Sequence, residues 1–451
     1  MSAAIKRRNA QTRTGDSHAV LSGYKRTEVG IIPEDWESSD IGSSKPFITS
    51  GSRGWARYYA ESGNPFLRIG NLTREKIYLD VSDVKFVQLS DSGDAERERT
   101  CVQDGDLLVS ITADIGIVAY VDGSVDKPAY INQHLALIRL DPTWVSPKFI
   151  AYYLASERPQ RLFVASMDVG AKAGLNLSSI RKVRLALPPA PEQRAIAEAL
   201  SDVDGLLGAL ETLIAKKRAI KQGAMQQLLT GKTRLPGFRG PWETRRLGEH
   251  VTYLRTGTNS RAELTSEGPT KYLHYGDIHT STQVRLSPSD RVMPSLPEER
   301  ARTLDRLKDG DLVFVDASED LDGVGKSVEI TGASDAEIVA GLHTIAARFD
   351  KAALVDGFKA FLQFCPAFRQ HLRRLAAGTK VYATNRGHIS SAEVPLPAVE
   401  EQTAIAAVLS DMDAEIAALE ARRDKTRAIK QGMMQQLLTG RVRLVKPEVA
   451  A

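Results

Sequence analysis

The sequence is poor in cysteine and in long apolar runs, and these absences exclude several classes of protein. Its 451 residues include two cysteines, Cys101 and Cys365, and neither lies in a CxxC motif. No disulfide framework and no structural zinc site is therefore expected. No apolar run is long enough to span a bilayer, and no secretory signal peptide is recognisable. With 26% charged residues and a net charge of +4, the composition predicts a globular, cytoplasmic protein with a mildly basic surface.

The ends of the chain differ from the rest in composition. Residues 1–24 are polar and basic and show no periodicity, which predicts a flexible tail. Contact with phosphate groups and plain disorder are both open for this tail. Residues 442–451 form a second predicted tail.

What the sequence does contain is a long repeat. Residues 192–235 and 401–444 align without a gap at an offset of 209, with 28 identities in 44 positions. The most similar part is RAIKQGAMQQLLTG at 218–231, which recurs as RAIKQGMMQQLLTG at 427–440. A repeat of this kind indicates one structural element that is used twice.

The repeated segments have the periodicity of long helices. Apolar residues recur at steps of three and four, as in a coiled-coil seam: Ile196, Leu200, Val203, Leu207, Leu210 and Ile214 in the first copy, and Ile405, Leu409, Met412, Ile416 and Leu419 in the second. Thr230-Gly231 and Thr439-Gly440 predict a glycine cap at each end. Each helix is predicted to have about 39 residues, or roughly 58 Å at 1.5 Å per residue.

Charge predicts how the two helices pair. Residues 192–211 hold five acids and one base, and residues 401–420 hold five acids and no base. Residues 216–234 hold six bases and no acid, and residues 422–443 hold seven bases and one acid. Antiparallel pairing sets the acidic halves against the basic halves, whereas parallel pairing opposes like charges. We therefore predict an antiparallel pair; two separate surface helices are the alternative.

Gly223 and Gly432 occupy matching positions inside these helices, where Gly costs about 1 kcal/mol relative to Ala. A close helix crossing would explain the pair, and so would a docking surface for another protein. The residues predicted to bind such a partner are Gly223, Met225, Gln226, Leu228, Gly432, Met434, Gln435 and Leu437.

The segments before the helices resemble each other weakly. From Trp36 to Leu72, an offset of 206 gives 8 identities in 37 positions. DGDLLVS at 104–110 parallels DGDLVFV at 309–315, and Asn132-Gln133-His134 parallels Gly341-Leu342-His343. Short strand-like runs are followed by a helical stretch in each segment, SPKFIAYYLASERPQRLFVAS and GFKAFLQFCPAFRQHLRRLAA. The pattern predicts α+β domains with twisted, curled, mostly antiparallel sheets.

The whole chain is thus predicted to be one unit written twice, an internal pseudo-twofold repeat. The predicted order is a tail, a domain, a helix, a domain, a helix and a tail, at 1–24, 25–190, 191–232, 233–398, 399–441 and 442–451. Two like helices suit two copies of one partner. Two unlike domains suit two different targets, and duplex DNA offers two sites at a fixed spacing along a rigid rod.

Over nearly all of residues 24–445, the chain resembles the specificity subunit of type I restriction-modification systems. The motifs that carry this resemblance are LALPPAPEQRAIAEAL with RAIKQGAMQQLLTG, VPLPAVEEQTAIAAVL with RAIKQGMMQQLLTG, GIIPEDWE, LRIGNL, DGDLLVSIT and INQHLALI. The arrangement of PPAPEQ and QQLLTG, with its counterpart PAVEEQ and QQLLTG, is quite specific.

The resemblance implies a function for each part. Residues 25–190 and 233–398 would be target recognition domains, each reading one half of a bipartite, asymmetric DNA site. The helices would set the spacing and dock two modification subunits, which bind S-adenosylmethionine and methylate adenine. Restriction subunits that use ATP and Mg would complete the complex, and the chain itself would be non-catalytic and hold no cofactor. Because Gly341-Leu342 replaces Asn132-Gln133, the carry-over of Asn and Gln roles to the second domain is in doubt.

Residue types in the loops suggest which side chains contact DNA. Base readout needs Arg, Asn, Gln and hydroxyls, and phosphate contacts need cations and backbone amides. The candidates in the first domain are Ser52, Arg53, Arg57, Tyr58, Arg68, Asn71, Thr112, Asn132 and Gln133. Those in the second are Thr258, Asn259, Arg261, His274, Asp277, Lys380, Tyr382, Asn385 and Arg386. We predict that Trp55, in the same loop as Arg53, is a core residue.

The sequence offers little support for catalysis. It has no NPPY-like tetrapeptide and no FxGxG-like loop, so no adenine methylation chemistry is expected in this chain. Gly325-Lys326-Ser327 resembles the end of a phosphate loop, but Asp320 stands where that motif needs Gly. His274, Asp277 and His279 have metal-ligating side chains; DNA-contacting or solvated roles are the preferred interpretation, and no metal is predicted.

Two other functions remain open. The chain could target a related phage-exclusion or type II-like restriction system, which the neighbouring genes would reveal. It could also be a scaffold that organises two identical partners without reading DNA, which predicts salt-insensitive assembly and no affinity for duplex DNA.

Overall fold

The computed structural model describes six segments, residues 22–89, 95–165, 174–289, 292–321, 323–376 and 381–445. The chain divides into two compact units, Met1–Leu210 with Arg422–Ala451, and Glu211–Ala421. Each unit therefore contains one α+β domain and one half of each long helix. Most of both predicted tails lies outside the described residues.

The two repeated segments form the longest helices, α5 (Ala190–Leu228) and α10 (Val399–Leu437), of 39 residues each. This is the predicted length. The capping residues Gly231 and Gly440 have φ angles of 67° and 70°, in the left-handed region that glycine adopts without strain. The predicted glycine caps are confirmed.

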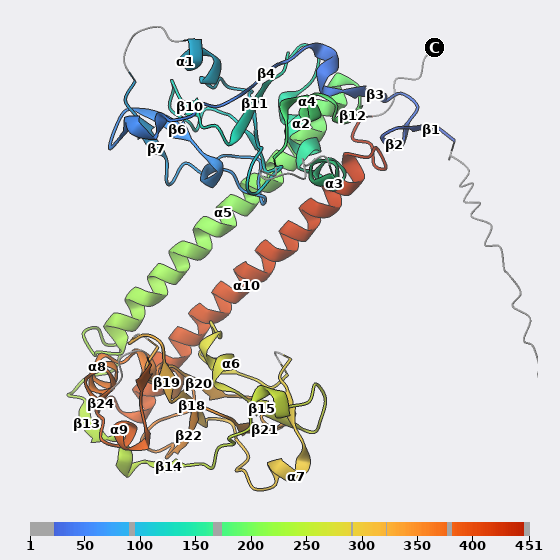
Figure 1. Cartoon of the computed structure of the whole chain (residues 1–451). Coiled ribbons are helices and arrows are strands. Elements are labelled where there is room, and N and C mark those ends of the chain that lie inside the picture. The colour runs from blue at the N-terminus through green and yellow to red at the C-terminus, as the bar shows by residue number, and fades with distance from the viewer. Residues whose placement is uncertain are drawn as a thin grey trace, which may run out of the picture. The chain divides into compact units, whose positions relative to one another are not determined.

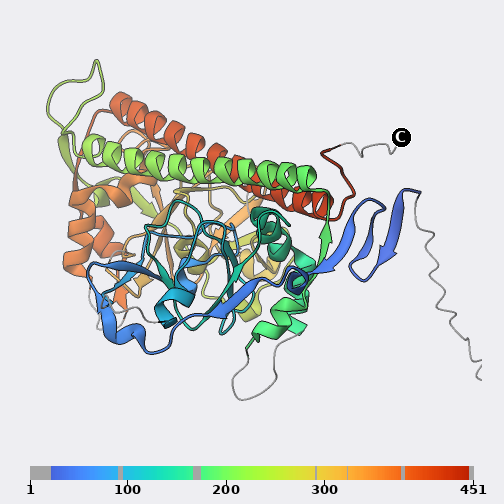
Figure 2. The same cartoon turned by 90° about the horizontal axis from the view of Figure 1, so that it is seen from above.

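Ion pairs show that the helices run antiparallel. In the first unit, Nζ of Lys430 in α10 lies 2.6 Å from Oδ1 of Asp204 in α5. In the second unit, Lys217 of α5 lies 2.6 Å from Glu415 of α10, and Lys221 pairs with Asp413. Acidic halves thus face basic halves, as predicted, and the two helices lie side by side (Figures 1 and 2).

The predicted apolar seam faces inward. Most of its members are less than 9% exposed, namely Ile196, Leu200, Leu207, Leu210, Ile214, Ile405, Leu409 and Ile416. The remaining members, Val203, Met412 and Leu419, are half-buried. The alternative of two separate surface helices is therefore wrong.

The first unit consists mainly of short strands. They are β1 (Tyr24–Thr27), β2 (Gly30–Pro33), β3 (Glu37–Asp40), β4 (Phe47–Ser50), β5 (Tyr59–Ala60), β6 (Asn64–Leu67), β7 (Lys85–Val87), β8 (Leu107–Ser110), β9 (Val118–Tyr120), β10 (Tyr130–Ile131), β11 (Leu135–Arg139) and β12 (Arg184–Leu187). The α-helices are α1 (Ala95–Thr100), α2 (Pro147–Ala155), α3 (Glu157–Ala165) and α4 (Leu177–Arg181), and the 3-10 helices are Ile41–Ser44, Trp55–Tyr58 and Ile69–Asn71. Two four-stranded sheets have the orders β4-β11-β8-β9 and β10-β6-β7-β5.

The second unit repeats this plan. Its strands are β13 (Glu243–Arg246), β14 (Val251–Tyr253), β15 (Thr270–Leu273), β16 (Arg285–Leu286), β17 (Ser295–Leu296), β18 (Leu312–Val315), β19 (Ala317–Ser318), β20 (Ser327–Ile330), β21 (Glu337–Ala340), β22 (Thr344–Phe349), β23 (Tyr382–Ala383) and β24 (Glu393–Leu396). The α-helices are α6 (Tyr275–His279), α7 (Glu298–Ala301), α8 (Pro366–Leu375) and α9 (Arg386–Ser390), and the 3-10 helices are Leu247–Glu249, Arg261–Glu263 and Lys359–Phe364. The larger sheets have the orders β14-β22-β18-β20-β16 and β17-β15-β21.

Matching strands pair in the same way in both units. The order β4-β11-β8-β9 corresponds to β14-β22-β18-β20, and the parallel pair β6–β10 corresponds to β15–β21. Apart from these pairs and β16–β20, the named strand pairs are antiparallel. The predicted α+β class with mostly antiparallel sheets and an internal repeat is confirmed.

The central strand of each sheet is buried on both faces. Leu107 of β8 packs in one apolar cluster and Leu108 in another, because successive side chains of a strand point to opposite faces. In β18, Leu312 and Val313 divide in the same way. The two layers of core explain why DGDLLVS and DGDLVFV are continuous apolar runs after the turn.

Each predicted terminal helix is interrupted. Ser156 is extended, with φ −76° and ψ 161°, and separates α2 from α3. In the second unit, Cys365 is extended and the Lys359–Phe364 3-10 helix ends before Pro366. A residue that precedes proline is driven out of the helical region by the proline ring, so the prediction of one helix in the second domain was wrong for a local reason.

An arginine, a glutamate and a tryptophan connect the domain to the helices in the same way in each unit. In the first unit, Arg443 bonds to Glu192 at the start of α5 and lies over the ring of Trp36, 5.8 Å from its centroid. The carboxylates of Glu192 and Asp35 raise the pKa of Arg443. In the second unit the equivalents are Arg234, Glu401 and Trp242, with two 2.5 Å hydrogen bonds and a 5.8 Å ring contact. This fastening gives a structural reason for the repeated Glu at each helix start and Arg after each helix end.

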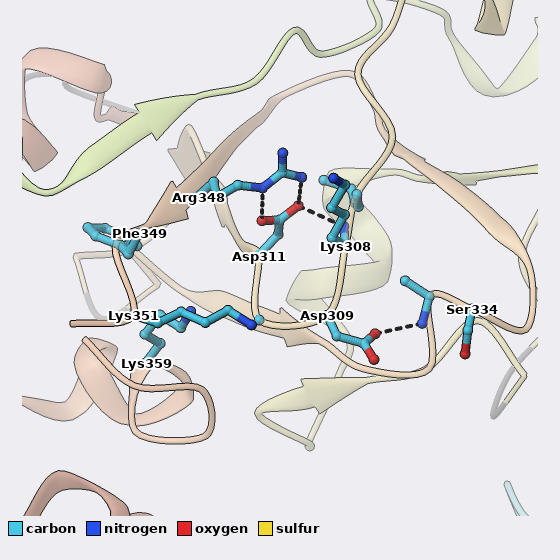
Figure 3. Close-up of a pocket in the computed structure, with 11 residues that line it drawn as sticks. Lys308, Asp309, Asp311, Ser334, Arg348, Phe349, Lys351 and Lys359 are labelled. Atoms are coloured by element: carbon cyan, nitrogen blue, oxygen red, sulfur yellow. Dashed lines mark hydrogen bonds and ion pairs between the residues drawn. The ribbon is translucent and has the colours of Figure 1, made fainter. Parts of the chain in front are cut away.

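A buried carboxylate in each DGD turn binds an arginine from the strand beside it. Asp311 accepts hydrogen bonds from Arg348 at 2.7 and 2.6 Å and from the Lys308 N–H at 2.7 Å (Figure 3). Asp106 and Arg139 repeat this fork in the first unit, at 2.8 and 2.6 Å. Asp311 lines a pocket of about 380 Å³, and Figure 3 labels Lys351 and Lys359 among the other residues that line it. Both lysines form ion pairs with Asp356. We therefore interpret the charged residues of this pocket as structural.

Replacing Asp311 with Ala should destabilise the second unit. The carboxylate is 2% exposed, whereas the Arg348 side chain is 36% exposed, so the loss is that of a buried hydrogen-bond acceptor and should cost about 1–3 kcal/mol. Peptide-resolved hydrogen exchange would measure the loss unit by unit. Asp311→Asn, which keeps an acceptor for the Lys308 N–H, should lose less. Unchanged protection around β18 and β22 in Asp311→Ala would contradict the assignment.

Candidate nucleic-acid interface

Three of the predicted residues of the first domain meet around one histidine. Oγ1 of Thr112 lies 2.6 Å from Nδ1 of His134, and Nε2 of Gln133 lies 3.2 Å from Nε2 of the same ring. Oδ1 of Asn132 accepts a hydrogen bond from the His134 N–H at 3.1 Å. The ends of β8 and β10 therefore present a hydroxyl, two amides and an imidazole together, which are the groups that read base edges.

Arg68 lies beside this cluster. It follows β6, whose last residue Leu67 pairs with Ile131 directly before Asn132. The Arg68 side chain is 28% exposed, and its guanidinium lies 3.7 Å from Oδ2 of Asp83. A cation that is partly exposed and only loosely paired is suited to contact a guanine or a phosphate.

Two predicted residues of the first domain are not accessible. Ser52 is 1% exposed, and its hydroxyl has no hydrogen-bond partner among the described residues. Asn71 is also 1% exposed; its oxygen caps the Arg68 N–H at 2.9 Å, and its amide donates to the carbonyl oxygens of Asp80 and Asp83. Both predictions are corrected, because Asn71 holds a loop together and Ser52 packs beneath the surface.

The Gly-rich loop at 50–59 keeps its remaining candidates on the surface. Arg53, Arg57 and Tyr58 are exposed, and the Arg57 guanidinium carbon lies 4.8 Å from the centroid of the Tyr58 ring. Trp55 is 4% exposed and packs against Phe66 and Tyr130, as predicted for a core residue. This loop therefore offers two cations and one aromatic ring to a ligand.

The second domain brings Arg261, His274 and Asp277 together. Asp277 accepts from the His274 N–H at 3.0 Å and from Arg261 at 3.3 Å. His274 is 5% exposed and caps α6, since its Nδ1 accepts from the Gly276 N–H at 3.2 Å. Burial, together with the charge of Arg261, lowers the pKa of His274. Of the three, Arg261 is the side chain that reaches solvent, and His274 and Asp277 shape the loop beneath it.

Other candidates in the 258–263 loop are partly engaged. Thr258 is exposed, and Nδ2 of Asn259 lies 3.3 Å from a carboxylate oxygen of Glu263. Hydrogen bonds from the Ser260 N–H and from Arg300 lower the pKa of Glu263 to about 2. The carboxylate therefore stays ionised at neutral pH and holds the loop in shape.

The third group of candidates surrounds α9. Lys380 lies outside the described residues. Tyr382 is half-buried in β23, and Asn385 caps α9 by accepting from the His388 N–H at 2.9 Å. Arg386 donates to the Leu254 carbonyl at 3.0 Å and lies over the Tyr253 ring. Asn385 and Arg386 are exposed, so each combines a structural bond with access to solvent.

The prediction of DNA-contacting residues from residue type did not include the two histidines at the centre of these sites. His134 and His343 occupy matching positions of the repeat, and His343 lies 3.2 Å from Oδ1 of Asp316. Tyr275, which lies between the chosen His274 and Asp277, was also missed although it is 36% exposed. The shared histidine of NQHLA and GLHTI was the available signal for the first two.

The helices carry an exposed surface that is identical in both copies. We name it the open stripe; it comprises Lys216, Ala219, Ile220, Gly223 and Gln227 of α5 and Lys425, Ala428, Ile429, Gly432 and Gln436 of α10, all exposed. Ile220 and Ile429 are 47% and 50% exposed. A Cβ at Gly223 or Gly432 would meet no described atom within 4 Å, so a close helix crossing does not explain these glycines.

The predicted partner-binding residues fall into three groups by exposure. Gly223, Gln226, Gly432 and Gln435 are exposed, and Met225 and Met434 are half-buried. Leu228 and Leu437 are 6% and 4% exposed and belong to the cores of the second and first units. The prediction for the two leucines is corrected, because they anchor the helix ends to the domains.

A groove borders α10 in the first unit. Its volume is about 1340 Å³, and its walls come from the end of α10, the β1–β2 hairpin and the α2–α3 region. Met434 and Gln435 line it together with Arg427 and Lys430. The last half of α10 thus offers two surfaces, the open stripe and this groove.

The described residues include no group of three His, Cys, Asp or Glu side chains placed to hold a metal ion. Within the same residues, no helix has the length and apolarity needed to cross a membrane. Gly325-Lys326-Ser327 leads into β20, with Lys326 bonded to the His279 carbonyl at 2.5 Å, whereas a phosphate loop leads into a helix.

Known proteins share several of these features. Residues 33–222 match the family described as type I restriction modification DNA specificity domain. The MjaX specificity subunit of a type I restriction enzyme from Methanocaldococcus jannaschii is 25% identical over 439 residues, which cover 93% of this chain and 97% of the relative. The MjaVIII specificity subunit of the same organism is 27% identical over 280 residues, 58% of this chain and 63% of the relative.

Solved structures share the fold. The crystal structure of the type-I restriction-modification system S subunit from M. genitalium has a TM-score of 0.55 and 14% identity, and the similarity covers 89% of this chain and 96% of that one. A chain of a structure on complex assembly and conformational transition of the type I R-M system has a TM-score of 0.51 and 17% identity, with 91% and 99% covered. Residues 33–222 thus match a type I specificity domain, the chain as a whole is similar to the MjaX specificity subunit, and its fold is that of these two solved structures.

Proposed function

We propose that this chain is the specificity subunit of a type I restriction-modification system. It reads a bipartite, asymmetric site in duplex DNA, with the domain at 25–190 on one half and the domain at 233–398 on the other. The α5–α10 pair sets the spacing between the half-sites and docks two copies of a modification subunit. The chain is the recognition component and performs no catalytic step.

The proposal rests on one observation: equivalent positions of the fold carry different side chains in the two domains. In the first domain, Thr112 and Gln133 surround His134. In the second, Asp316 and Tyr275 surround His343. Different donors and acceptors at equivalent positions are expected of two domains that read different base sequences.

The open stripe supports two identical partners. Its ten residues are the same at each matching position although they are exposed, and its glycines touch no described side chain. Exposed isoleucines beside uncrowded glycines give a surface on which another helix can approach closely. Two like surfaces on one chain suit two copies of one subunit.

The chemistry belongs to the partners in this proposal. The modification subunits bind S-adenosylmethionine and methylate adenine, and the restriction subunits use ATP and Mg. The absence of an NPPY-like or FxGxG-like motif in the sequence supports the assignment of a purely recognising role. Targeting of a related phage-exclusion or type II-like system, and a scaffold that does not read DNA, are the alternative functions.

Methylation sequencing of host DNA, with and without the gene for this chain, tests the proposal. We expect a split motif with methylated adenine in both half-sites, and its complete loss on deletion. Restoring the gene on a plasmid should restore the motif and serves as the control. An unchanged methylome, with the modification subunits present and active, would contradict the recognition role and favour the scaffold.

A further inference from the structure

An exposed tyrosine is held in a fixed orientation in the second domain. Tyr275 begins α6 and is 36% exposed. Its ring centroid lies 4.4 Å from that of His274, 5.5 Å from His343 and 6.0 Å from His279. The last two rings meet it edge-on, at 89° and 86°. Three imidazoles from two segments of the chain therefore fix a ring that remains open to solvent.

The residues that hold this ring are themselves fixed. His343 has φ 57° in the left-handed region, and its Nδ1 lies 3.2 Å from Asp316. A non-glycine residue in this conformation costs free energy and persists where its surroundings enforce it. Nε2 of His279 donates to the Ala317 carbonyl at 3.0 Å. The ring of Tyr275 thus loses little further freedom on binding, which favours its use as a contact surface.

The first domain has a different residue at this position. At the offset of 206, Ile69 corresponds to Tyr275, and Ile69 is half-buried against an apolar cluster. Arg68 and Gln133 provide the polar groups nearby. The first domain therefore offers hydrogen-bonding groups where the second offers an aromatic face.

We infer that Tyr275 is a specificity-determining residue of the second half-site and that its ring contacts the 5-methyl group of a thymine in the major groove. This inference rests on the proposed function. Because the partners methylate adenine in each half-site, each half-site contains an A·T pair and therefore a thymine. Apolar contact with the thymine methyl group is one of the ways in which protein side chains distinguish A·T from other pairs.

The charges around the ring are compatible with this contact. Arg261 is 60% exposed and offers a cation for a nearby phosphate, while Asp277 and Asp316 are engaged by Arg261 and His343. Lys326 is bonded to the His279 carbonyl beneath α6. The two described carboxylates, Asp277 and Asp316, therefore both have a hydrogen-bond partner within the chain.

The test compares thymine with deoxyuridine, which lacks the methyl group. The full chain, assembled with its modification subunits, is bound to duplexes that carry the mapped motif, and each thymine of the second half-site is replaced in turn. At one position the wild-type complex should bind about fourfold more weakly after replacement, the effect of losing one buried methyl group. Tyr275→Ala should bind the two duplexes equally, and Tyr275→Phe should keep the preference because the ring and not the hydroxyl makes the contact.

Val292→Ala serves as a matched control, since Val292 is a 98% exposed apolar residue of the same unit, and it should keep the fourfold preference. The inference is overturned if no thymine of the second half-site shows the preference, or if Tyr275→Ala retains it. Thermal melting of the variants checks that they are folded. Absence of any motif or duplex binding in the wild-type complex would instead overturn the proposed function, so the two failures are distinguishable.

Discussion

Exchanging residues 25–190 for the recognition domain of a type I specificity subunit should, under the proposed function, change one half of the methylated motif and leave the other half unchanged. The cluster around His134 and the loop with Arg53 and Arg57 are built entirely from this segment, and the contacts among them lie within the first unit. The second domain keeps all of its own candidate residues after the exchange. Methylation sequencing of cells that carry the chimaera measures the outcome.

The design of the chimaera follows from the contacts with the helices. The incoming domain must supply a tryptophan at position 36 and an acid at position 35, because Arg443 stacks on the one and pairs with the other. The reciprocal exchange of residues 233–398 should change the opposite half of the motif. A chimaera that alters both halves, or neither, would show that the two domains do not read DNA independently.

Substituting Asp for Ile220 and Ile429 together should abolish adenine methylation while the chain stays folded. Both side chains are about half exposed, and neither belongs to a described core cluster. A charge at the centre of an apolar docking surface removes a dominant contact and should cost at least about 2 kcal/mol at each surface, or roughly 30-fold in affinity. Light scattering of the complex, and methylation of plasmid DNA, report the two expected losses.

Single variants sharpen this prediction. Under the proposed function each surface binds one copy of the modification subunit, so Ile220→Asp or Ile429→Asp alone should leave a complex that has lost one of the two copies. Leu213→Asp is the matched control: Leu213 is 37% exposed on the same helix, but its counterpart in the repeat is Arg422, so it belongs to no duplicated surface. A normal complex in the double variant, or loss of assembly in the control, would contradict docking at the open stripe.

Long, periodic and charged elements were predictable because their determinants are local and repeated. The 39-residue helices follow from a seam of apolar residues at steps of three and four, and their antiparallel pairing follows from the acidic and basic halves. Strands within the domains were predicted less well. The segment KIYLDVSDVKFV at 76–87, for example, is one of the strand-like runs of the sequence, but it forms a strand only at Lys85–Val87, since short strands depend on the neighbours with which they pair.

Individual site residues depended on the tertiary structure. Ser52 and Asn71 have side chains of the types that contact DNA, yet both are buried. The Asn71 amide forms its hydrogen bonds with backbone groups of its own loop. A polar side chain looks the same in the sequence whether it bonds to the backbone or faces solvent. The same holds for Leu228 and Leu437, which share the repeat with the open stripe but point into the cores.

Composition, the repeat and helical periodicity were thus sufficient to establish two unlike domains, two like helices and the direction in which the helices pair. These properties are set by patterns that persist over tens of residues, so they survive uncertainty about any one contact. The assembly of Thr112, Gln133 and His134 at one point, and the three imidazoles around Tyr275, arose from folding alone. Each joins segments that are distant in the chain, and strand pairing and packing decide which of those segments meet.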